Sequence, residues 1–87
     1  MENRISVISI IVEEISISSE VNKLLHDYRD YIVGRMGIHY RERGISIICV
    51  VLDAPGDAVS ALSGKLGMLK GVNTKTVVSK KISSKEG

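Results

Sequence analysis

Two runs of β-branched residues, about 40 positions apart, constrain the fold of this chain more than any other feature. The first is ISVISIIVEE from Ile5, and the second is ISIICVVLDA from Ile45. Val and Ile lose side-chain freedom in a helix and pack well on a pleated surface, so both runs predict strands. Because the second run repeats the first, the chain is expected to consist of two similar halves.

Each run is followed by a predicted helix and then by a second, shorter strand. The apolar positions of both helices recur at helical spacing, i, i+3, i+4 and i+7 in the first and i, i+3, i+7 and i+10 in the second, which is typical of an amphipathic helix. They are Val21, Leu24, Leu25 and Tyr28 in the first helix, and Val59, Leu62, Leu66 and Leu69 in the second. The shorter strands are expected over residues 31–40 and 72–79, which gives the element order β-α-β-β-α-β.

This order predicts an α+β fold, the ferredoxin-like two-layer sandwich, with both helices on one face of the sheet. We expect an antiparallel sheet with parallel central strands, in which the first and third strands are neighbours and the other two lie at the edges. At 87 residues the chain has room for one domain, predicted over residues 1–80, followed by a flexible polar tail over residues 81–87.

Both faces of the two central strands are apolar. In the first strand one set of alternate residues is Ile8, Ile10 and Val12, and the other is Ile5, Val7 and Ile11. In the third strand the corresponding sets are Ile48, Val50 and Leu52, and Ile45, Ile47 and Val51. The helices can cover only one set, and six exposed apolar side chains would each forgo roughly 1.5 to 3 kcal/mol of burial. We therefore predict a homo-oligomer, a homodimer or homotetramer, that covers the open face. The alternative is that parallel central strands are apolar on both faces in any case.

A stripe of small residues runs beside the apolar stripe of the second helix. It consists of Ser60, Ser63, Gly64 and Gly67. Small side chains let another backbone approach, so this stripe is expected to admit either the neighbouring helix of the same chain or a second subunit.

Composition excludes several classes of function. Twelve basic and ten acidic residues leave a net charge of only +2, and Phe and Trp are absent, so the chain lacks both the charge and the stacking aromatics of a nucleic-acid-binding surface. No apolar run is long enough for a membrane span, and the single cysteine cannot form an internal disulfide. We expect a cytoplasmic protein that binds neither nucleic acid nor membrane.

Metal binding and catalysis find little support in the sequence. His26, His39 and Cys49 do not share the short spacing of a metal site, so no metal and no cofactor is expected within one chain. The adjacent Glu13 and Glu14 point to opposite sides of a strand and cannot act as a catalytic pair. The chain is therefore not expected to be an enzyme, and a minimal hydrolase is the weaker hypothesis.

Two segments remain as binding candidates. At the corner DAPGD, Asp53, Gly56 and Asp57 are predicted to bind a small ligand through side chains and the free amides of a helix start. The alternative is an ordinary turn in which Asp57 caps the helix. Around the predicted hairpin, a second set of residues could bind an anion or an acidic partner, unless it is simply a solvated tip. This second set is Arg35, Tyr40, Arg41 and Arg43.

The segments YIVGRMGIHYRERG, from Tyr31, and ISIICVVLDAPGDAVSALSGKLGMLKGV, from Ile45, resemble the family of small regulators assigned to the iron-only hydrogenase system. The resemblance extends to about Val78. It implies an ACT-like form of the ferredoxin-like fold, similar to the C-terminal domain of nickel-responsive repressors, an oligomer, and a regulatory role beside hydrogenase maturation proteins. ACT domains that bind amino acids often carry an Asp-x-Pro-Gly corner after the first strand, whereas here it follows the third. The histidine-rich strand of the nickel sensors is not reproduced.

The favoured hypothesis is a noncatalytic regulatory module, associated with iron-only hydrogenase, that senses a small-molecule effector between copies of itself. The first alternative is an intersubunit transition-metal sensor of the nickel type that uses His39 and Cys49. The second is an adaptor that binds another regulatory protein and no ligand.

Overall fold

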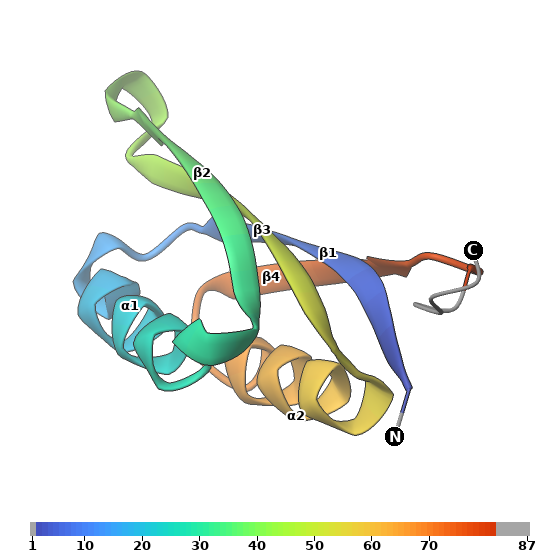
Figure 1. Ribbon diagram of the computed structural model, residues 1–87. Helices are drawn as coiled ribbons and strands as arrows, with labels where there is room; N and C mark the ends of the chain where they lie inside the picture. Colours follow the sequence, from blue (N-terminus) through green and yellow to red (C-terminus); the bar gives the residue numbers. More distant parts are fainter. Residues whose placement is uncertain (1, 82–87) are drawn as a thin grey trace.

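The computed structural model describes residues 2–81, and its elements follow the predicted order β-α-β-β-α-β (Figure 1). The strands are β1 (Asn3–Val12), β2 (Ile32–Tyr40), β3 (Ile45–Pro55) and β4 (Val72–Val78), and the helices are α1 (Ser18–Asp27) and α2 (Gly56–Gly67). Short 3-10 turns occupy Ile15–Ile17, Arg29–Tyr31 and Arg41–Arg43. From residue 82 onward, the tail predicted over residues 81–87 lies outside the described residues.

The four strands form one antiparallel sheet in the order β2-β3-β1-β4. The expectation of parallel central strands is wrong, because β1 pairs with β3 in antiparallel register, from Ile5 opposite Asp53 to Val12 opposite Ser46. The two strands joined by a helix, β1 and β2 or β3 and β4, do run parallel to each other. In the sheet, however, β3 lies between β1 and β2, and β1 lies between β3 and β4. The parallel pairs, β1 with β2 and β3 with β4, are therefore not neighbours.

Both helices pack on one face of the sheet, and the core lies between the two layers (Figure 1). The alternation predicted for the central strands is confirmed, since Ile8, Ile10, Val50 and Leu52 are fully buried on the helix face. The helices contribute Val21, Leu25, Val59, Leu62 and Leu66. The buried hydrophobic cluster of the described residues is therefore aliphatic, and Tyr28 packs against it.

A bulge in β2 changes which face its residues occupy. Ile32 pairs with Leu52, but Gly34 pairs with Val51, so one extra residue is inserted between them. Because successive strand residues point to opposite faces, this insertion puts Ile32 on the helix face although Met36 lies on the other. A strand without the bulge would carry Ile32 and Met36 on one face.

Glycines with positive φ make two of the turns. Gly44, at φ 65°, closes the hairpin between β2 and β3, and Gly71, at φ 78°, connects α2 to β4. Residues with a Cβ are disfavoured in this left-handed region. The carbonyl of Gly71 also accepts a hydrogen bond of 2.7 Å from the amide of Glu13, which ties this turn to the end of β1.

The two helices contact each other at the edge of the core, where the Lys65 ammonium lies 5.2 Å from the centroid of the Tyr28 ring. Helix α2 begins directly after Pro55, and no side chain caps its first turn. Asp57 therefore lies inside the first turn and is not the N-cap that the sequence suggested. Within residues 2–81, neither helix has the length and hydropathy needed to cross a membrane.

Candidate functional site

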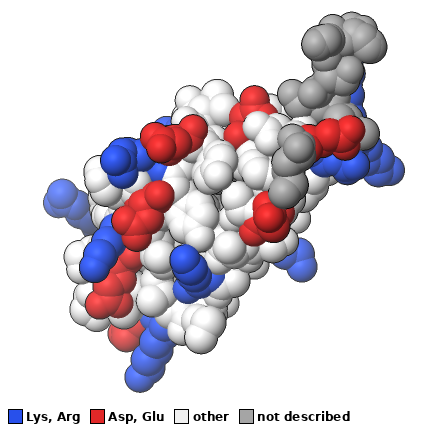
Figure 2. All heavy atoms as spheres, turned by 60° about the horizontal axis from the view of Figure 1, so that its bottom comes forward, with Lys and Arg blue, Asp and Glu red and all other residues white. Residues whose placement is uncertain are grey.

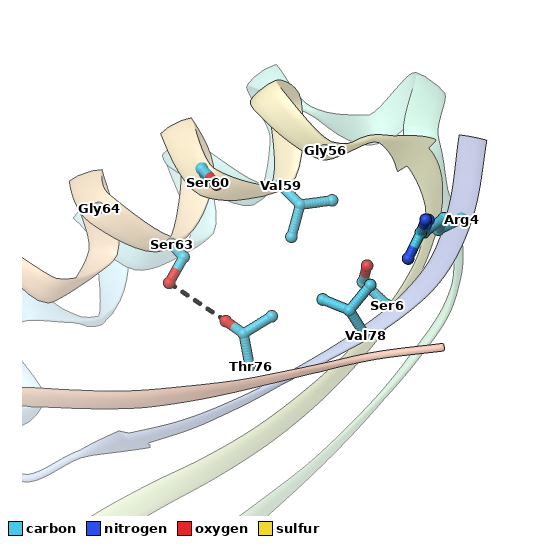
Figure 3. Close-up of a pocket in the computed structure, with 9 residues that line it drawn as sticks. All are labelled: Arg4, Ser6, Gly56, Val59, Ser60, Ser63, Gly64, Thr76 and Val78. Atoms are coloured by element: carbon cyan, nitrogen blue, oxygen red, sulfur yellow. Dashed lines mark hydrogen bonds between the residues drawn. The ribbon is translucent and has the colours of Figure 1, made fainter. Parts of the chain in front are cut away.

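A cavity of about 490 Å³ opens between α2 and the β1–β4 edge of the sheet (Figure 3). Three elements line it: the start of β1, one side of α2, and the end of β4. The lining residues are Arg4, Ser6, Gly56, Val59, Ser60, Ser63, Gly64, Thr76 and Val78.

The cavity exists because the side of α2 that faces β4 carries small residues. Gly56, Ser60 and Gly64 recur every four positions, so they line one side of the helix. A Cβ added to Gly56 or Gly64 would meet no atom within 4 Å, which shows that unfilled space adjoins both residues. Three of the four residues of the predicted stripe, Ser60, Ser63 and Gly64, thus line a cavity beside β4, and the expectation that the stripe admits the neighbouring helix of the same chain was wrong.

The polar groups of the cavity come from all three elements. Ser6 is only 1% exposed, and its hydroxyl points into the cavity from β1 (Figure 3). Deeper along the helix, the hydroxyl of Thr76 donates a hydrogen bond of 3.2 Å to that of Ser63, which joins β4 to α2. Arg4 lies near the start of α2, with its guanidinium directed toward the cavity (Figure 3).

The sequence reasoning missed Arg4, Ser6 and Thr76. One signal for Ser6 was present: it continues the helix-facing series of β1 that otherwise reads Ile8, Ile10 and Val12. A hydroxyl at a core position that apolar residues would normally fill is a sign of a polar environment on that face. No such signal was available for Arg4, because its neighbours are determined by the fold.

The corner residues predicted to bind a ligand do not converge. Gly56 lines the cavity, whereas Asp57 is exposed in the first turn of α2. Asp53 pairs with Ile5 and lies on the opposite face of the sheet. Its Oδ1 atom is buried and has no hydrogen-bond partner among the described residues. The structure therefore does not gather the three residues in one cavity.

The predicted anion-binding residues are divided between the two faces of the sheet. Arg35 lies on the helix face and donates a hydrogen bond of 3.0 Å to the Oδ1 of Asn22 in α1. Tyr40 lies on the open face and is 44% exposed. Arg41 and Arg43 are exposed in the turn at the hairpin tip. The structure thus brings no guanidinium cluster together here.

His39 and Cys49 also lie on opposite faces. The Nδ1 of His39 is 2.9 Å from the hydroxyl of Ser46 on the helix face, and Cys49 is half-buried on the open face, opposite Met36. Among residues 2–81, no group of three or more His, Cys, Asp or Glu side chains could hold a metal ion.

The face of the sheet opposite the helices is mainly apolar, and we refer to it as the open face. Strand pairing assigns to it Ile5, Val7 and Ile11 of β1, Ile45, Ile47 and Val51 of β3, Met36, Ile38 and Tyr40 of β2, and Val77 of β4. Met36 is 70% exposed, Val77 is 66% exposed and Ile38 is 61% exposed. The helix side is different, since Figure 2 shows acidic and basic side chains interspersed over it.

Residues 4–76 match the model of the TM1266-like family, which is described as "Iron-only hydrogenase system regulator, putative". Among solved structures, the chain is similar to the uncharacterized protein TM1266 from Thermotoga maritima, with a TM-score of 0.87 and 40% identity over 91% of this chain and 100% of that one. It is also similar to a formyltetrahydrofolate deformylase from Pseudomonas putida KT2440, with a TM-score of 0.65 and 14% identity over 88% of this chain and 30% of that one. At that identity the likeness concerns the fold alone. The search of curated proteins found no match.

Proposed function

Because the chain belongs to the TM1266-like family of iron-only hydrogenase system regulators, we propose that it is a noncatalytic regulatory module that works as a homodimer closed over its open face. The element order and the placement of both helices on one face suit the ferredoxin-like, ACT-like fold of such a module. The single observation that carries the proposal is the uncovered apolar surface of the sheet.

The size of this surface is sufficient for an interface. A sheet of four strands is about 19 Å wide at about 4.8 Å per strand, and strands of this length run for about 30 Å. The open face therefore measures roughly 600 Å² in projection, and its accessible area is larger because the side chains stand out from the sheet. Monomers rarely expose apolar patches above a few hundred Å², whereas a stable interface covers about 800 Å² per partner.

The charges on the open face favour a second copy of the same chain as the partner. The charged residues at its paired positions are Lys75 of β4 and Asp53 of β3, which have opposite signs. Two copies of this face therefore meet without net repulsion, and a two-fold axis lets the same patch cover itself. A partner with a strongly charged surface would find only these two charges, of opposite sign, at the paired positions of this face.

The chemistry of the cavity favours binding over catalysis. Its lining offers hydroxyls and one guanidinium but no His, Cys, Asp or Glu side chain. A serine or threonine hydroxyl is a weak nucleophile unless an adjacent base removes its proton. Ser6, Ser63 and Thr76 therefore serve as hydrogen-bonding groups in this proposal.

A deletion and complementation experiment tests the proposed function. In the organism that carries this chain, deletion of its gene should change the transcript level or the activity of iron-only hydrogenase. The wild-type gene and the Met68→Glu variant should restore the original level, and Met36→Glu should not. Both methionines are exposed in the single chain, 70% for Met36 and 86% for Met68, but only Met36 lies on the open face.

Two results would contradict the proposal. If deletion leaves hydrogenase transcript and activity unchanged, the regulatory role is wrong. If Met36→Glu complements as well as Met68→Glu does, the regulatory role does not need the open face. Circular dichroism of both variants serves as the control for folding.

A further inference from the structure

We propose that the cavity between α2 and the β1–β4 edge binds a small organic oxyanion, a phosphate monoester or a carboxylate. Arg4 and the first amides of α2 hold the anionic group, and Ser6 donates a hydrogen bond to it. This inference rests on the proposed function, because it names the chemical class of the effector that the regulatory module would sense.

The positive end of the cavity is the first argument. The four N-terminal amides of a helix have no partner within the helix, and the helix dipole places partial positive charge at the same end. No side chain caps the first turn of α2 after Pro55. The guanidinium of Arg4 lines the same cavity, and the lining contains no carboxylate. Asp57 is the one acidic residue of this turn, and its side chain is exposed.

The buried hydroxyl of Ser6 is the second, independent argument. Ser6 is 99% removed from solvent in a strand whose other helix-facing residues are Ile8, Ile10 and Val12. Its hydroxyl points into the cavity from β1 (Figure 3). Hydrogen bonds to charged groups are stronger than those between neutral groups, so an oxyanion in the cavity gains more from this hydroxyl than the solvent it replaces.

The remaining lining indicates the kind of molecule that carries the anion. A volume of about 490 Å³ lies within the range of roughly 300 to 1,000 Å³ that is usual for small-molecule sites. This volume exceeds the needs of a single inorganic ion. Val59 and Val78 provide apolar contact, while Ser63 and Thr76 offer hydroxyls farther along. The lining contains no carboxylate to pair with an ammonium group, so an anion is favoured over a zwitterion or a cation.

The test is an NMR titration of the ¹⁵N-labelled full-length protein at constant ionic strength. The probes are inorganic phosphate, glucose 6-phosphate and succinate. We expect at least one probe to shift the amide signals of Ser6, Gly56 and Thr76 in a saturable way. Binding of phosphate or its ester would identify a phosphate ligand, and binding of succinate alone would identify a carboxylate. Either result supports an oxyanion site.

Variants separate this site from nonspecific attraction to positive charge. Arg4→Gln should weaken binding at least tenfold, whereas Arg41→Gln, which removes an exposed arginine of the hairpin tip, should leave it unchanged. Gly64→Leu should abolish binding while the protein stays folded, because its side chain grows into open space.

The proposal is overturned if no probe binds with a Kd below about 10 mM, if the shifts centre on the hairpin, or if Arg4→Gln binds as tightly as the wild type. The titration requires neither hydrogenase nor a known oligomeric state. Failure here would therefore leave the proposed regulatory dimer untouched, and a chain that proved monomeric could still show binding.

Discussion

Three glycine-to-alanine substitutions test how the turns of this fold are stabilised. Gly44 and Gly71 have similar positive φ values, 65° and 78°, and Gly64 lies in the body of α2. A Cβ at Gly44 or Gly64 would meet nothing within 4 Å. At Gly71 it would lie 2.5 Å from Cγ and 2.7 Å from Cβ of Glu14. The same substitution is thus made in a helix at Gly64, in a left-handed turn at Gly44, and in a left-handed turn with a steric clash at Gly71.

The expected free energies differ in sign and size. A left-handed residue with a Cβ costs roughly 1 to 2 kcal/mol, and alanine recovers about 0.4 to 1 kcal/mol by restricting the unfolded chain. Gly44→Ala should therefore lower the free energy of unfolding by up to about 1.6 kcal/mol. Gly71→Ala should lower it by about 2 to 3 kcal/mol, because displacing Glu14 adds to the strain. Gly64→Ala should raise it by roughly 0.5 to 1 kcal/mol.

The assay is urea unfolding followed by circular dichroism, at one protein concentration because association would change the apparent stability. The double variant Gly71→Ala/Glu14→Ala is the control for the clash. It lacks the Cγ atom of Glu14 that the new Cβ of residue 71 would meet at 2.5 Å. Glu14→Ala should recover part of the free energy of unfolding that Gly71→Ala loses, but it should change the stability of the wild type little. If Gly71→Ala proved as stable as Gly44→Ala, our explanation of this turn would be refuted.

Two further predictions concern the core and the open face. Leu62→Ala should lower the free energy of unfolding by about 2 to 5 kcal/mol, because the side chain is fully buried, whereas Leu69→Ala, at a partly buried position, should cost less in the same urea experiment. Cys49 lies half-buried on the open face, so its reaction with a thiol reagent should slow as the wild-type concentration rises. In the Met36→Glu variant, Cys49 should react at the same rate at all protein concentrations. A wild-type rate that does not depend on concentration would count against coverage of this face.

The sequence predicted the elements and their faces well, because both depend on local periodicity. Alternation of β-branched residues distinguished Ile8 and Ile10, which are buried under the helices, from Val7 and Ile11 on the open face. Alternation contains no information on strand direction. It therefore could not correct the expectation of parallel central strands, and it failed where the bulge after Ile32 shifts the period by one residue.

The candidate site was much harder to predict, because a cavity is the absence of atoms between segments that are distant in sequence. The small residues of α2, such as Ser60 and Gly64, were noticed as a stripe, but the sequence did not show what the stripe faces. Arg4 and Thr76 line the same cavity as this stripe only because β1 pairs with β4 and α2 packs beside that edge of the sheet. Conversely, Asp53 and Asp57 are close in sequence, but strand alternation separates them.

Sedimentation velocity of the untagged protein, over a dilution series from about 100 μM to 1 μM, tests the central claim most directly. The account predicts a particle of twice the 9.5 kDa chain mass for the wild type and for Met68→Glu, and a folded single chain for Met36→Glu. A wild-type protein that sediments as a folded 9.5 kDa particle at every concentration would contradict the claim that a second copy covers the open face.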